Sequence, residues 1–370
     1  MHNKYYIFYG GGRWGKIVLA ELSGISEYPI YWVTQYHNDL NQEWLLQNNY
    51  TNIEIFGDLS KHEILESSGV FLVNSTQERI KFLESDLSNS IDVFAEKPIA
   101  WCAKHAVETK LKFAKNQSLL YLNLEYFFDL NLKKFQSLIR NLTIKRVDLI
   151  WEDAHFIKLN EGFKFPDFDT PQILDHFPHI WSILNSIGLQ LDETKLTETL
   201  YMDDNTIKIA LINDQCEINL ILSRRRTSRK RLVSINQRYE IELLSDSISL
   251  KDCKSGVIET HKNINGNVRQ SLQSFIKSTH DRKNRIHSLD NQMQMLNLAH
   301  HIQDSIDLKI MQILKKYKEE IRPSCCNQFL LNACEDRFRP YYQHKETDKF
   351  DMNIQEHKRK FLRFIKKYIE

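Results

Sequence analysis

The chain has 370 residues, of which 42% are hydrophobic and 26% charged, and its formal net charge is +2 at pH 7. This length predicts two domains, and the composition is ordinary for a soluble globular enzyme. No apolar run is long enough to cross a membrane, the first residues lack a signal-peptide pattern, and the small net charge argues against nucleic-acid binding. The six cysteines form no C-x-x-C pair, which favours free thiols and a cytoplasmic location.

The first motif is a glycine-rich turn between an expected strand and an expected helix. The run YYIFY (residues 5–9) suits a buried strand, and WGKIVLAEL has apolar residues at helical spacing. Gly10, Gly12 and Gly15 fit the pattern G-x-G-x-x-G. In such a turn the glycines permit a tight bend, a close approach of backbone to a pyrophosphate, and close packing of helix on strand. The helix N-terminus adds free N–H groups, so the motif predicts a dinucleotide site.

Further strands and helices follow in alternation. We expect strands at 30–34, 52–56, 69–75, 91–97 and 118–126, and helices between most of them, notably 76–86 and 103–115. This alternation predicts a doubly wound parallel sheet. The second strand ends at Val33-Thr34-Gln35 without the acidic residue that would bind the ribose 2′-hydroxyl of NAD, and Asp39 comes several residues later. We therefore favour NADP weakly over NAD, although no Arg stands there to bind a 2′-phosphate.

Glu96-Lys97-Pro98 follows the fifth strand, and this pattern downstream of the glycine turn resembles the Gfo/Idh/MocA (glucose-fructose oxidoreductase and inositol dehydrogenase) family. The resemblance covers about residues 4–311. Three more segments carry it: VFLVNST (70–76), the D-x-x-x-H segment in LDHFPHIWSIL (174–184), and the pair SFIKSTHDRKN and NLAHHIQDSIDLK near the end.

The resemblance implies an N-terminal Rossmann domain at 1–125 and a C-terminal α/β domain with an open, mainly antiparallel sheet at 126–311, closed by helices at 270–311. It also implies an NAD(P)-dependent oxidoreductase that acts on a hydroxyl or ketone of a sugar-like metabolite, and a homo-oligomer formed through the C-terminal sheet. Lys97 and His179 would relay the proton that accompanies the hydride, with Asp175 in support, and the Lys97–Pro98 bond would be cis. The expected cofactor-binding residues are Gly10, Gly12, Arg13, Trp14, Gly15, Thr34, Asn74, Ser75, Glu96 and Lys97.

The sequence departs from the family pattern where substrate is expected. Arg79 stands where the family usually has a His, and Glu125 and Tyr126 replace an often-found Arg. With His176, Glu125 and Tyr126 become candidate substrate residues. Two alternatives stay open: reduction of a C=N bond in a biosynthetic intermediate, and a non-catalytic dinucleotide-binding scaffold.

The helix expected around Asp175 and His179 places both side chains on one face, because they are four residues apart. Pro178 is tolerated if this helix begins near Leu174 or Asp175, since a first-turn proline loses no hydrogen bond. A metal held by Asp175, His176 and His179 together with His155 is a minority interpretation, and we expect no metal.

Two basic segments have no assigned role. The run SRRRTSRKR (223–231) favours a solvated strand edge or hairpin, with an anionic substrate site as the second interpretation. The extension 312–370 is basic and partly helical in pattern, with Cys325, Cys326 and Cys334 as incidental thiols.

Overall fold

The structure is a computed structural model. It describes residues 4–34, 39–154, 157–159, 162–164, 170–189, 191, 193–203, 206–213, 216–226, 228–243, 247–262, 266–280 and 289–320. The chain divides into two compact units, one formed by Met1–Asp129 and Asn265–Asn297, and the other by Leu130–Ile264 and Leu298–Glu370. Among the described residues, no helix is both long and apolar enough to span a membrane.

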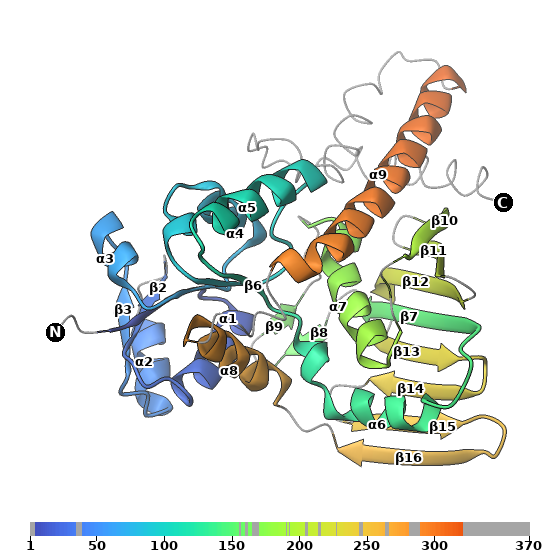
Figure 1. Ribbon diagram of the computed structural model, residues 1–370, viewed down its shortest axis with the longest axis horizontal. Helices are drawn as coiled ribbons and strands as arrows, with labels where there is room; N and C mark the ends of the chain where they lie inside the picture. Colours follow the sequence, from blue (N-terminus) through green and yellow to red (C-terminus); the bar gives the residue numbers. More distant parts are fainter. Residues whose placement is uncertain are drawn as a thin grey trace. The chain divides into compact units, whose positions relative to one another are not determined.

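The first unit is built on a six-stranded parallel sheet with the order β3-β2-β1-β4-β5-β6 (Figure 1). Its strands are β1 (Tyr6–Tyr9), β2 (Ile30–Val33), β3 (Ile53–Phe56), β4 (Val70–Leu72), β5 (Val93–Ala95) and β6 (Leu120–Leu122). The strands are short and almost wholly buried, as expected where helices cover both faces of a parallel sheet. The order reverses between β1 and β4, and ligands of open α/β sheets bind at such a point, outside the carboxyl ends of the strands.

Helices lie on both faces of this sheet, with α4 and α5 on one face and α1 and α8 on the other in Figure 1. The helical segments of the unit are α1 (Arg13–Ser23), α2 (Asp39–Gln47), α3 (Lys61–Glu66), α4 (Thr76–Glu84), η1 (Ser88–Ser90), α5 (Ala103–Lys115), η2 (Glu125–Phe128) and α8 (Asn267–His280). The alternation predicted from the sequence is therefore confirmed, with most strands one to four residues shorter than expected.

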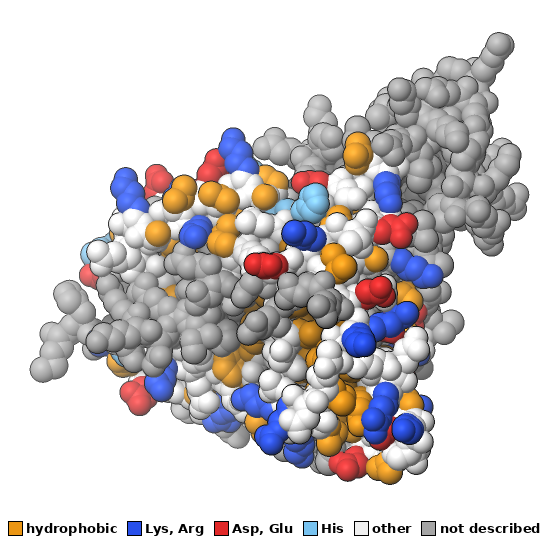
Figure 2. Space-filling model, turned by 45° about the vertical axis from the view of Figure 1, so that its right-hand side comes forward, with side chains coloured by type: hydrophobic (Ala, Val, Ile, Leu, Met, Phe, Trp, Pro, Cys, Tyr) orange, Lys and Arg blue, Asp and Glu red, His pale blue; other side chains and the backbone are white. Residues whose placement is uncertain are grey.

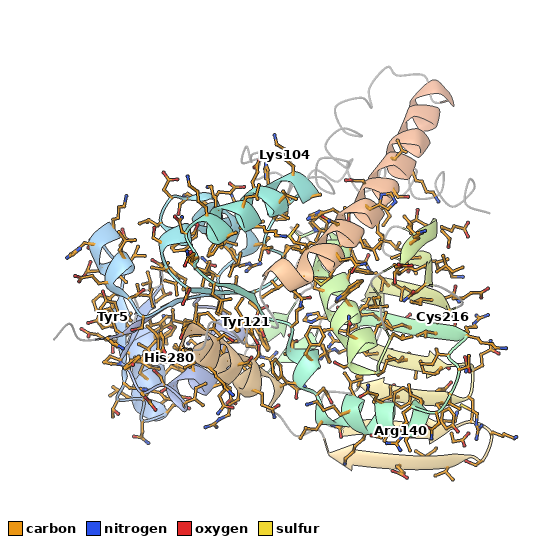
Figure 3. All side chains as sticks on the ribbon, viewed as in Figure 1. Tyr5, Lys104, Tyr121, Arg140, Cys216 and His280 are labelled. Atoms are coloured by element: carbon orange, nitrogen blue, oxygen red, sulfur yellow. The ribbon has the colours of Figure 1, made fainter. Side chains whose placement is uncertain are left out.

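Helix α8 belongs to the first unit, although the sequence analysis placed it with the second domain. Its Phe275 is fully buried and packs edge-on against Phe71, Phe94 and Tyr121 of three neighbouring strands. Figure 3 labels Tyr121 beside this helix. The apolar face of α8 completes the core of the parallel sheet, which sequence proximity to the later strands did not reveal.

The second unit contains an eight-stranded sheet with the order β10-β11-β12-β7-β13-β14-β15-β16. Its strands are β7 (Arg146–Ala154), β10 (Lys195–Asp203), β11 (Thr206–Asn213), β12 (Cys216–Arg226), β13 (Lys230–Ile235), β14 (Tyr239–Leu243), β15 (Ser247–Asp252) and β16 (Val257–Lys262). Only the β12–β7 pair is parallel. A short pair, β8 (Ile157–Leu159) and β9 (Gly162–Lys164), stands apart. The predicted fold class, a doubly wound parallel sheet plus a mainly antiparallel one, is confirmed.

Helices α6 (Leu130–Ile139) and α7 (Gln172–Ser186) pack with this sheet, and α9 (Leu289–Glu320) contributes its later residues to the unit. Along β7, Val147, Leu149 and Trp151 are buried while the alternate residues are partly exposed. This period of two shows that one face of the sheet forms the core of the unit.

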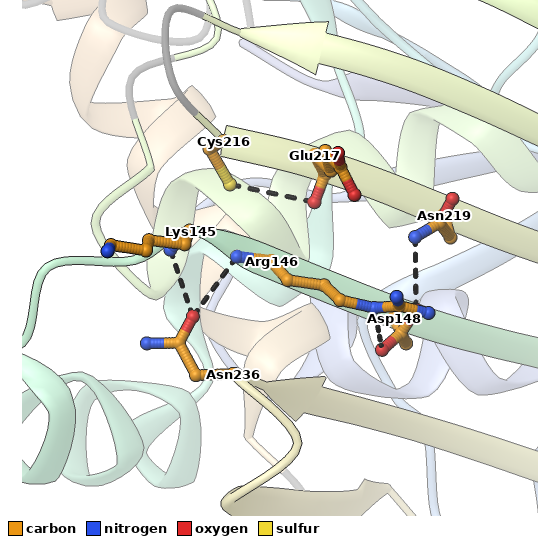
Figure 4. Close-up of polar contacts among 7 residues, drawn as sticks. All are labelled: Lys145, Arg146, Asp148, Cys216, Glu217, Asn219 and Asn236. Atoms are coloured by element: carbon orange, nitrogen blue, oxygen red, sulfur yellow. Dashed lines mark hydrogen bonds and ion pairs between the residues drawn. The ribbon is translucent and has the colours of Figure 1, made fainter.

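The start of β7 is held by the turn between β13 and β14 (Figure 4). The Asn236 side-chain oxygen accepts hydrogen bonds from the backbone N–H groups of Lys145 and Arg146, at 2.9 and 3.1 Å. Asn236 and Gln237 both have positive φ, at 50° and 56°, and with Arg238 they form the loop between the paired residues Ile235 and Tyr239. Strands β13 and β14 therefore form an antiparallel hairpin.

Two sequence expectations about local structure are wrong. Helix α7 begins at Gln172, so Pro178 lies in its interior rather than in its first turn. The proline there cannot donate to the carbonyl one turn earlier. The basic run 223–231 connects β12 to β13, and both strands pair with β7, so it is neither a hairpin between them nor a sheet edge. On the face drawn in Figure 2, Lys and Arg side chains are interspersed with Asp and Glu among the described residues.

Candidate functional site

The glycine-rich turn leaves β1 at the point where the strand order reverses. Gly10 has φ of +153°, and a Cβ there would lie 2.9 Å from the Val73 carbonyl oxygen. A Cβ on Gly15 would lie 3.0 Å from the Gly10 carbonyl carbon. A Cβ on Gly12 would meet no atom within 4 Å. The first and third glycines are therefore required by the protein's own packing, whereas the second leaves open space over the start of α1.

The turn is fixed from beneath by hydrogen bonds to buried side chains. The indole N–H of Trp32 on β2 donates to the Gly10 carbonyl oxygen over 2.6 Å. The indole N–H of Trp14, the second residue of α1, donates to the carboxylate of Glu96 over 2.8 Å. Asn123, after β6, donates to the same carboxylate oxygen over 2.6 Å and accepts a hydrogen bond from Ser271 of α8. A polar chain thus links the start of α1 to the ends of β5 and β6.

Glu96 is therefore a buried structural acceptor in this arrangement, with 6% of its surface exposed. The resemblance to the family implies that it binds the cofactor. Trp14 and Asn123 donate hydrogen bonds to its carboxylate. A buried carboxylate needs such donors to offset the loss of its hydration. Its contribution to a cofactor site would come through the placement of Trp14 and the glycine turn.

The loops after β4 and β5 lie next to the glycine turn, since β4 pairs with both β1 and β5. Asn74 follows β4, and its side-chain oxygen is buried without a hydrogen-bond partner in the part of the chain that the structure describes. Ser75 caps α4 by accepting from the Glu78 backbone N–H over 3.4 Å. Lys97 follows β5, and the Lys97–Pro98 bond is cis, as the resemblance implied.

The remaining candidate cofactor residues lie around the same edge of the sheet. Thr34 follows β2 and is buried, and its backbone N–H donates to the Phe56 carbonyl oxygen. Arg13 is the first residue of α1 and is exposed. The residues after Thr34 lie outside the described ranges up to Asp39, which begins α2.

These residues fit a dinucleotide. The open space at Gly12 lies at the N-terminus of α1, where backbone N–H groups point outward and favour an anionic pyrophosphate. The unsatisfied oxygen of Asn74, one strand away, offers an acceptor for a hydroxyl or amide group of the ligand. The first unit thus offers free backbone N–H groups beside open space at Gly12, and a buried amide acceptor at Asn74, at the carboxyl edge of its sheet.

In the second unit, α7 carries the residues of the D-x-x-x-H segment. His176 is 2% exposed, and its Nε2 lies 3.1 Å from a carboxylate oxygen of Asp153 on β7 and 3.5 Å from one of Asp175. Asp175, expected to support His179, thus has His176 as a close neighbour.

His179 stacks on the indole ring of Trp151, with ring centroids 5.4 Å apart and an interplanar angle of 7°. The Arg231 guanidinium lies over the same indole, 3.8 Å from its centroid. Arg231 also lies 3.3 Å from Asp153, and Arg229 lies 3.7 Å from it. The end of the basic run therefore reaches Trp151 and Asp153 on β7, which the α7 histidines also contact, instead of forming only a solvated surface.

Asp153 is the charged centre of this group, which we call the Asp153 cluster (Trp151, Asp153, Asp175, His176, His179, Arg229 and Arg231). Burial by itself would raise the pKa of Asp153. The hydrogen bond and positive charge of His176, together with Arg231 and Arg229, outweigh that effect and hold the pKa well below its ordinary value. The carboxylate thus stays ionised and fixes the ring of His176 and two guanidinium groups.

Glu125 and Tyr126 lie in η2, whose residues contact α8 in the first unit. The sequence analysis did not single out Trp151, Asp153 or Asn123. A polar residue within an expected strand carries no local signal, and their partners come from distant parts of the chain. His155, Cys325, Cys326 and Cys334 lie outside the described residues. Within the described ranges, no group of three or more His, Cys, Asp or Glu residues is placed to hold a metal ion.

Comparisons with known proteins agree with this architecture. No protein-family model and no curated protein sequence matches the chain. Among solved structures, a Gfo/Idh/MocA family oxidoreductase from Vibrio cholerae is similar with a TM-score of 0.63 and 12% identity, covering 83% of this chain and 99% of that one.

Two further structures were solved with ligands. The 3-ketoreductase KijD10 from Actinomadura kijaniata, in complex with TDP-benzene and NADP, has a TM-score of 0.62 and 9% identity, covering 82% of this chain and 97% of that one. An oxidoreductase from Agrobacterium radiobacter, in complex with NAD+, L-tartaric acid and magnesium, has a TM-score of 0.61 and 10% identity, covering 82% and 96%. The chain therefore has the fold of the Gfo/Idh/MocA oxidoreductases.

Proposed function

We propose that this protein is an NAD(P)-dependent oxidoreductase that transfers a hydride between nicotinamide and a hydroxyl or ketone carbon of a sugar-like metabolite. One observation carries the proposal. The glycine turn, Asn74 and Lys97 follow the neighbouring strands β1, β4 and β5, at the sheet edge where open α/β folds bind their ligands. The oxidoreductase solved with NAD+ and the 3-ketoreductase solved with NADP, which share this fold, support it.

Lys97 is the residue we assign to proton transfer in the first unit. A hydride that leaves or reaches a carbinol carbon must be accompanied by a proton on its oxygen. A lysine side chain donates a proton as the ammonium and accepts one as the amine, so Lys97 could serve the transfer in either direction. The bound dinucleotide would supply or accept the hydride.

His179 is the second member of the proposed relay, with Asp175 in support, and both belong to α7 of the second unit. The stack on Trp151 fixes the plane of the His179 ring. Asp175 and Asp153 flank His176, which makes His176 a candidate to bind a substrate hydroxyl. We extend the proposal to an anionic group on the substrate, because Arg229 and Arg231 come from a basic run that ends at these residues.

The weak preference for NADP remains part of the proposal. It depends on the missing acidic residue at the end of β2, which would otherwise repel a 2′-phosphate. We also propose a cytoplasmic location and a homo-oligomer formed through the eight-stranded sheet.

The first test needs no substrate. Titration of the purified protein with NADH and with NADPH, followed by nicotinamide fluorescence, should show saturable binding of at least one of them. Absence of binding to both would contradict the central proposal. A screen of keto-sugars and of cyclic imines with the preferred cofactor then separates C=O from C=N reduction, and turnover of any substrate excludes a purely non-catalytic scaffold.

Once a substrate is found, Lys97→Met tests the relay. We expect kcat to fall by roughly 100-fold or more, because general acid–base catalysis contributes about that much. Lys104→Met is the matched control, since Lys104 is an exposed lysine on the nearby α5 with 80% of its side chain accessible. Full turnover by Lys97→Met would refute the assignment.

A further inference from the structure

Arg79 is a buried arginine on α4, with 3% of its surface exposed. It stands at a position that the sequence analysis associated with substrate. Its guanidinium instead lies against the backbone of two loops, the one after β4 and the one after β5. A guanidinium offers five N–H donors in a fixed plane, so it can join several acceptors at once.

Four hydrogen bonds describe this arrangement. Nη1 donates to the carbonyl oxygen of Asn74 in the loop after β4 over 2.7 Å, and Nη2 donates to the hydroxyl of Thr76, the first residue of α4, over 3.1 Å. In the loop after β5, Nη2 donates to the Lys97 carbonyl oxygen over 2.8 Å and Nε donates to the Pro98 carbonyl oxygen over 3.1 Å. A single side chain thus bonds to the backbone of both Asn74 and Lys97.

The backbone of Arg79 is also held in place. Its backbone N–H donates to the Ser75 carbonyl oxygen over 3.0 Å in the first turn of α4, a helix capped by the Ser75 side chain. Because the two loops follow adjacent strands and are joined by one planar group, they cannot shift independently without breaking charge-assisted hydrogen bonds in a buried place. Such bonds are costly to leave unmade.

We infer that Arg79 is a positioning residue that sets the nicotinamide end of the cofactor site by fixing Asn74 and Lys97 relative to one another. This inference rests on the proposed function. It differs from the assignment of the glycine turn, which lies after β1 and would hold the pyrophosphate. Loss of Arg79 should therefore weaken contacts to the nicotinamide end and leave those to the rest of the dinucleotide in place.

The test compares two ligands in one protein. Isothermal titration calorimetry gives Kd for two ligands. The first is the reduced cofactor that the wild type prefers. The second is ADP-ribose, which lacks the nicotinamide, or its 2′-phosphate if the preferred cofactor is NADPH. For Arg79→Ala we expect Kd for the reduced cofactor to rise about tenfold, the change that one misplaced charge-assisted hydrogen bond produces. We expect Kd for ADP-ribose to stay within about twofold of wild type.

Two further measurements separate positioning from general loss of stability. Leu83→Ala removes a fully buried side chain from the same helix without touching the hydrogen bonds of Arg79, so it should lower Tm but leave the ratio of the two Kd values unchanged. Guanidinium ions at millimolar concentration should partly restore reduced-cofactor binding to Arg79→Ala. If Arg79→Ala does not fold, Arg79→Lys keeps the charge but cannot span both loops, and the same change in ratio is expected.

The outcomes are distinguishable. If a folded Arg79 variant has the wild-type ratio of Kd for the reduced cofactor to Kd for ADP-ribose, the inference is overturned and the proposed function stays intact. The same holds if Leu83→Ala changes this ratio as much as the Arg79 variant does. A wild-type protein that binds neither ligand would overturn the proposed function and, with it, this inference.

Discussion

The three glycines of the turn should respond differently to the same substitution. Gly12→Ala adds a methyl group where no protein atom lies within 4 Å, at a residue with extended backbone angles (φ −75°, ψ 176°) that any amino acid can adopt. Gly10→Ala and Gly15→Ala add it 2.9 and 3.0 Å from neighbouring backbone atoms. If the turn holds a pyrophosphate, only Gly12→Ala should affect binding more than stability.

The free-energy changes follow from these contacts. For Gly12→Ala the reduced entropy of the unfolded chain and the poorer N-cap offset one another, so the free energy of unfolding should change by less than about 0.5 kcal/mol. Gly10→Ala combines an unfavourable φ with a contact to a backbone oxygen, and it should destabilise the protein by roughly 1–3 kcal/mol. Gly15→Ala should fall in a similar range, of roughly 1–3 kcal/mol, because the Gly10 backbone must move.

Gly12→Ala should weaken cofactor binding although it changes stability little. A methyl group at this position would keep a pyrophosphate from the N–H groups of α1, and we expect Kd for the reduced cofactor to rise by roughly 10- to 100-fold, or about 1.4–2.8 kcal/mol. The assay is fluorescence titration with NADH or NADPH, paired with urea denaturation of the same preparation. Wild-type affinity in Gly12→Ala, or a loss of stability as large as that of Gly10→Ala, would refute the assignment of the turn as a pyrophosphate site.

Two further predictions concern the second unit. Gln237→Gly should stabilise the protein by roughly 0.5–1 kcal/mol, because Gln237 is exposed with φ of 56°, a left-handed conformation that glycine adopts without a Cβ penalty; thermal unfolding measures it, and a lower Tm would contradict this account of the loop. Asp153→Asn should cost roughly 3 kcal/mol at pH 7, because it leaves Arg231 and His176 without their carboxylate partner. Since the pKa of Asp153 is depressed in the folded protein, its contribution is present above its ordinary pKa and is lost as pH falls through acid values. Urea denaturation at pH 7 and at pH 3 should therefore show a smaller acid effect in Asp153→Asn than in wild type, and an equal effect would contradict this account.

The alternation of strands and helices in the first unit could be predicted because its signals are local. Buried strands such as 5–9 are short apolar runs, and the glycine turn and the sequence Glu96-Lys97-Pro98 lie directly after strands. The hydrogen-bond partners of Arg79 could not be predicted from such local signals. Its position in the sequence suggested a substrate contact, whereas its hydrogen bonds go to loop carbonyls that only the pairing of β4 with β5 brings within reach.

The second unit shows where local patterns fail. Its central strand β7 pairs with β12 and β13, which follow it by about 70 and 80 residues, so the sequence around either partner carries no information on that pairing. The same pairing brings Arg229 and Arg231 to Asp153, and it turns a basic run that looks like a solvated edge into part of a charged cluster.

The sequence by itself determined where the dinucleotide turn lies and which unit is a parallel sheet, because short-range periodicity and glycine spacing encode both. Only the tertiary structure decided how Glu96, Arg79 and Asp153 are used. A buried charge is stabilised by whichever donors and acceptors the fold brings to it, and for these three side chains most of the partners lie on strands, loops or helices from other parts of the chain.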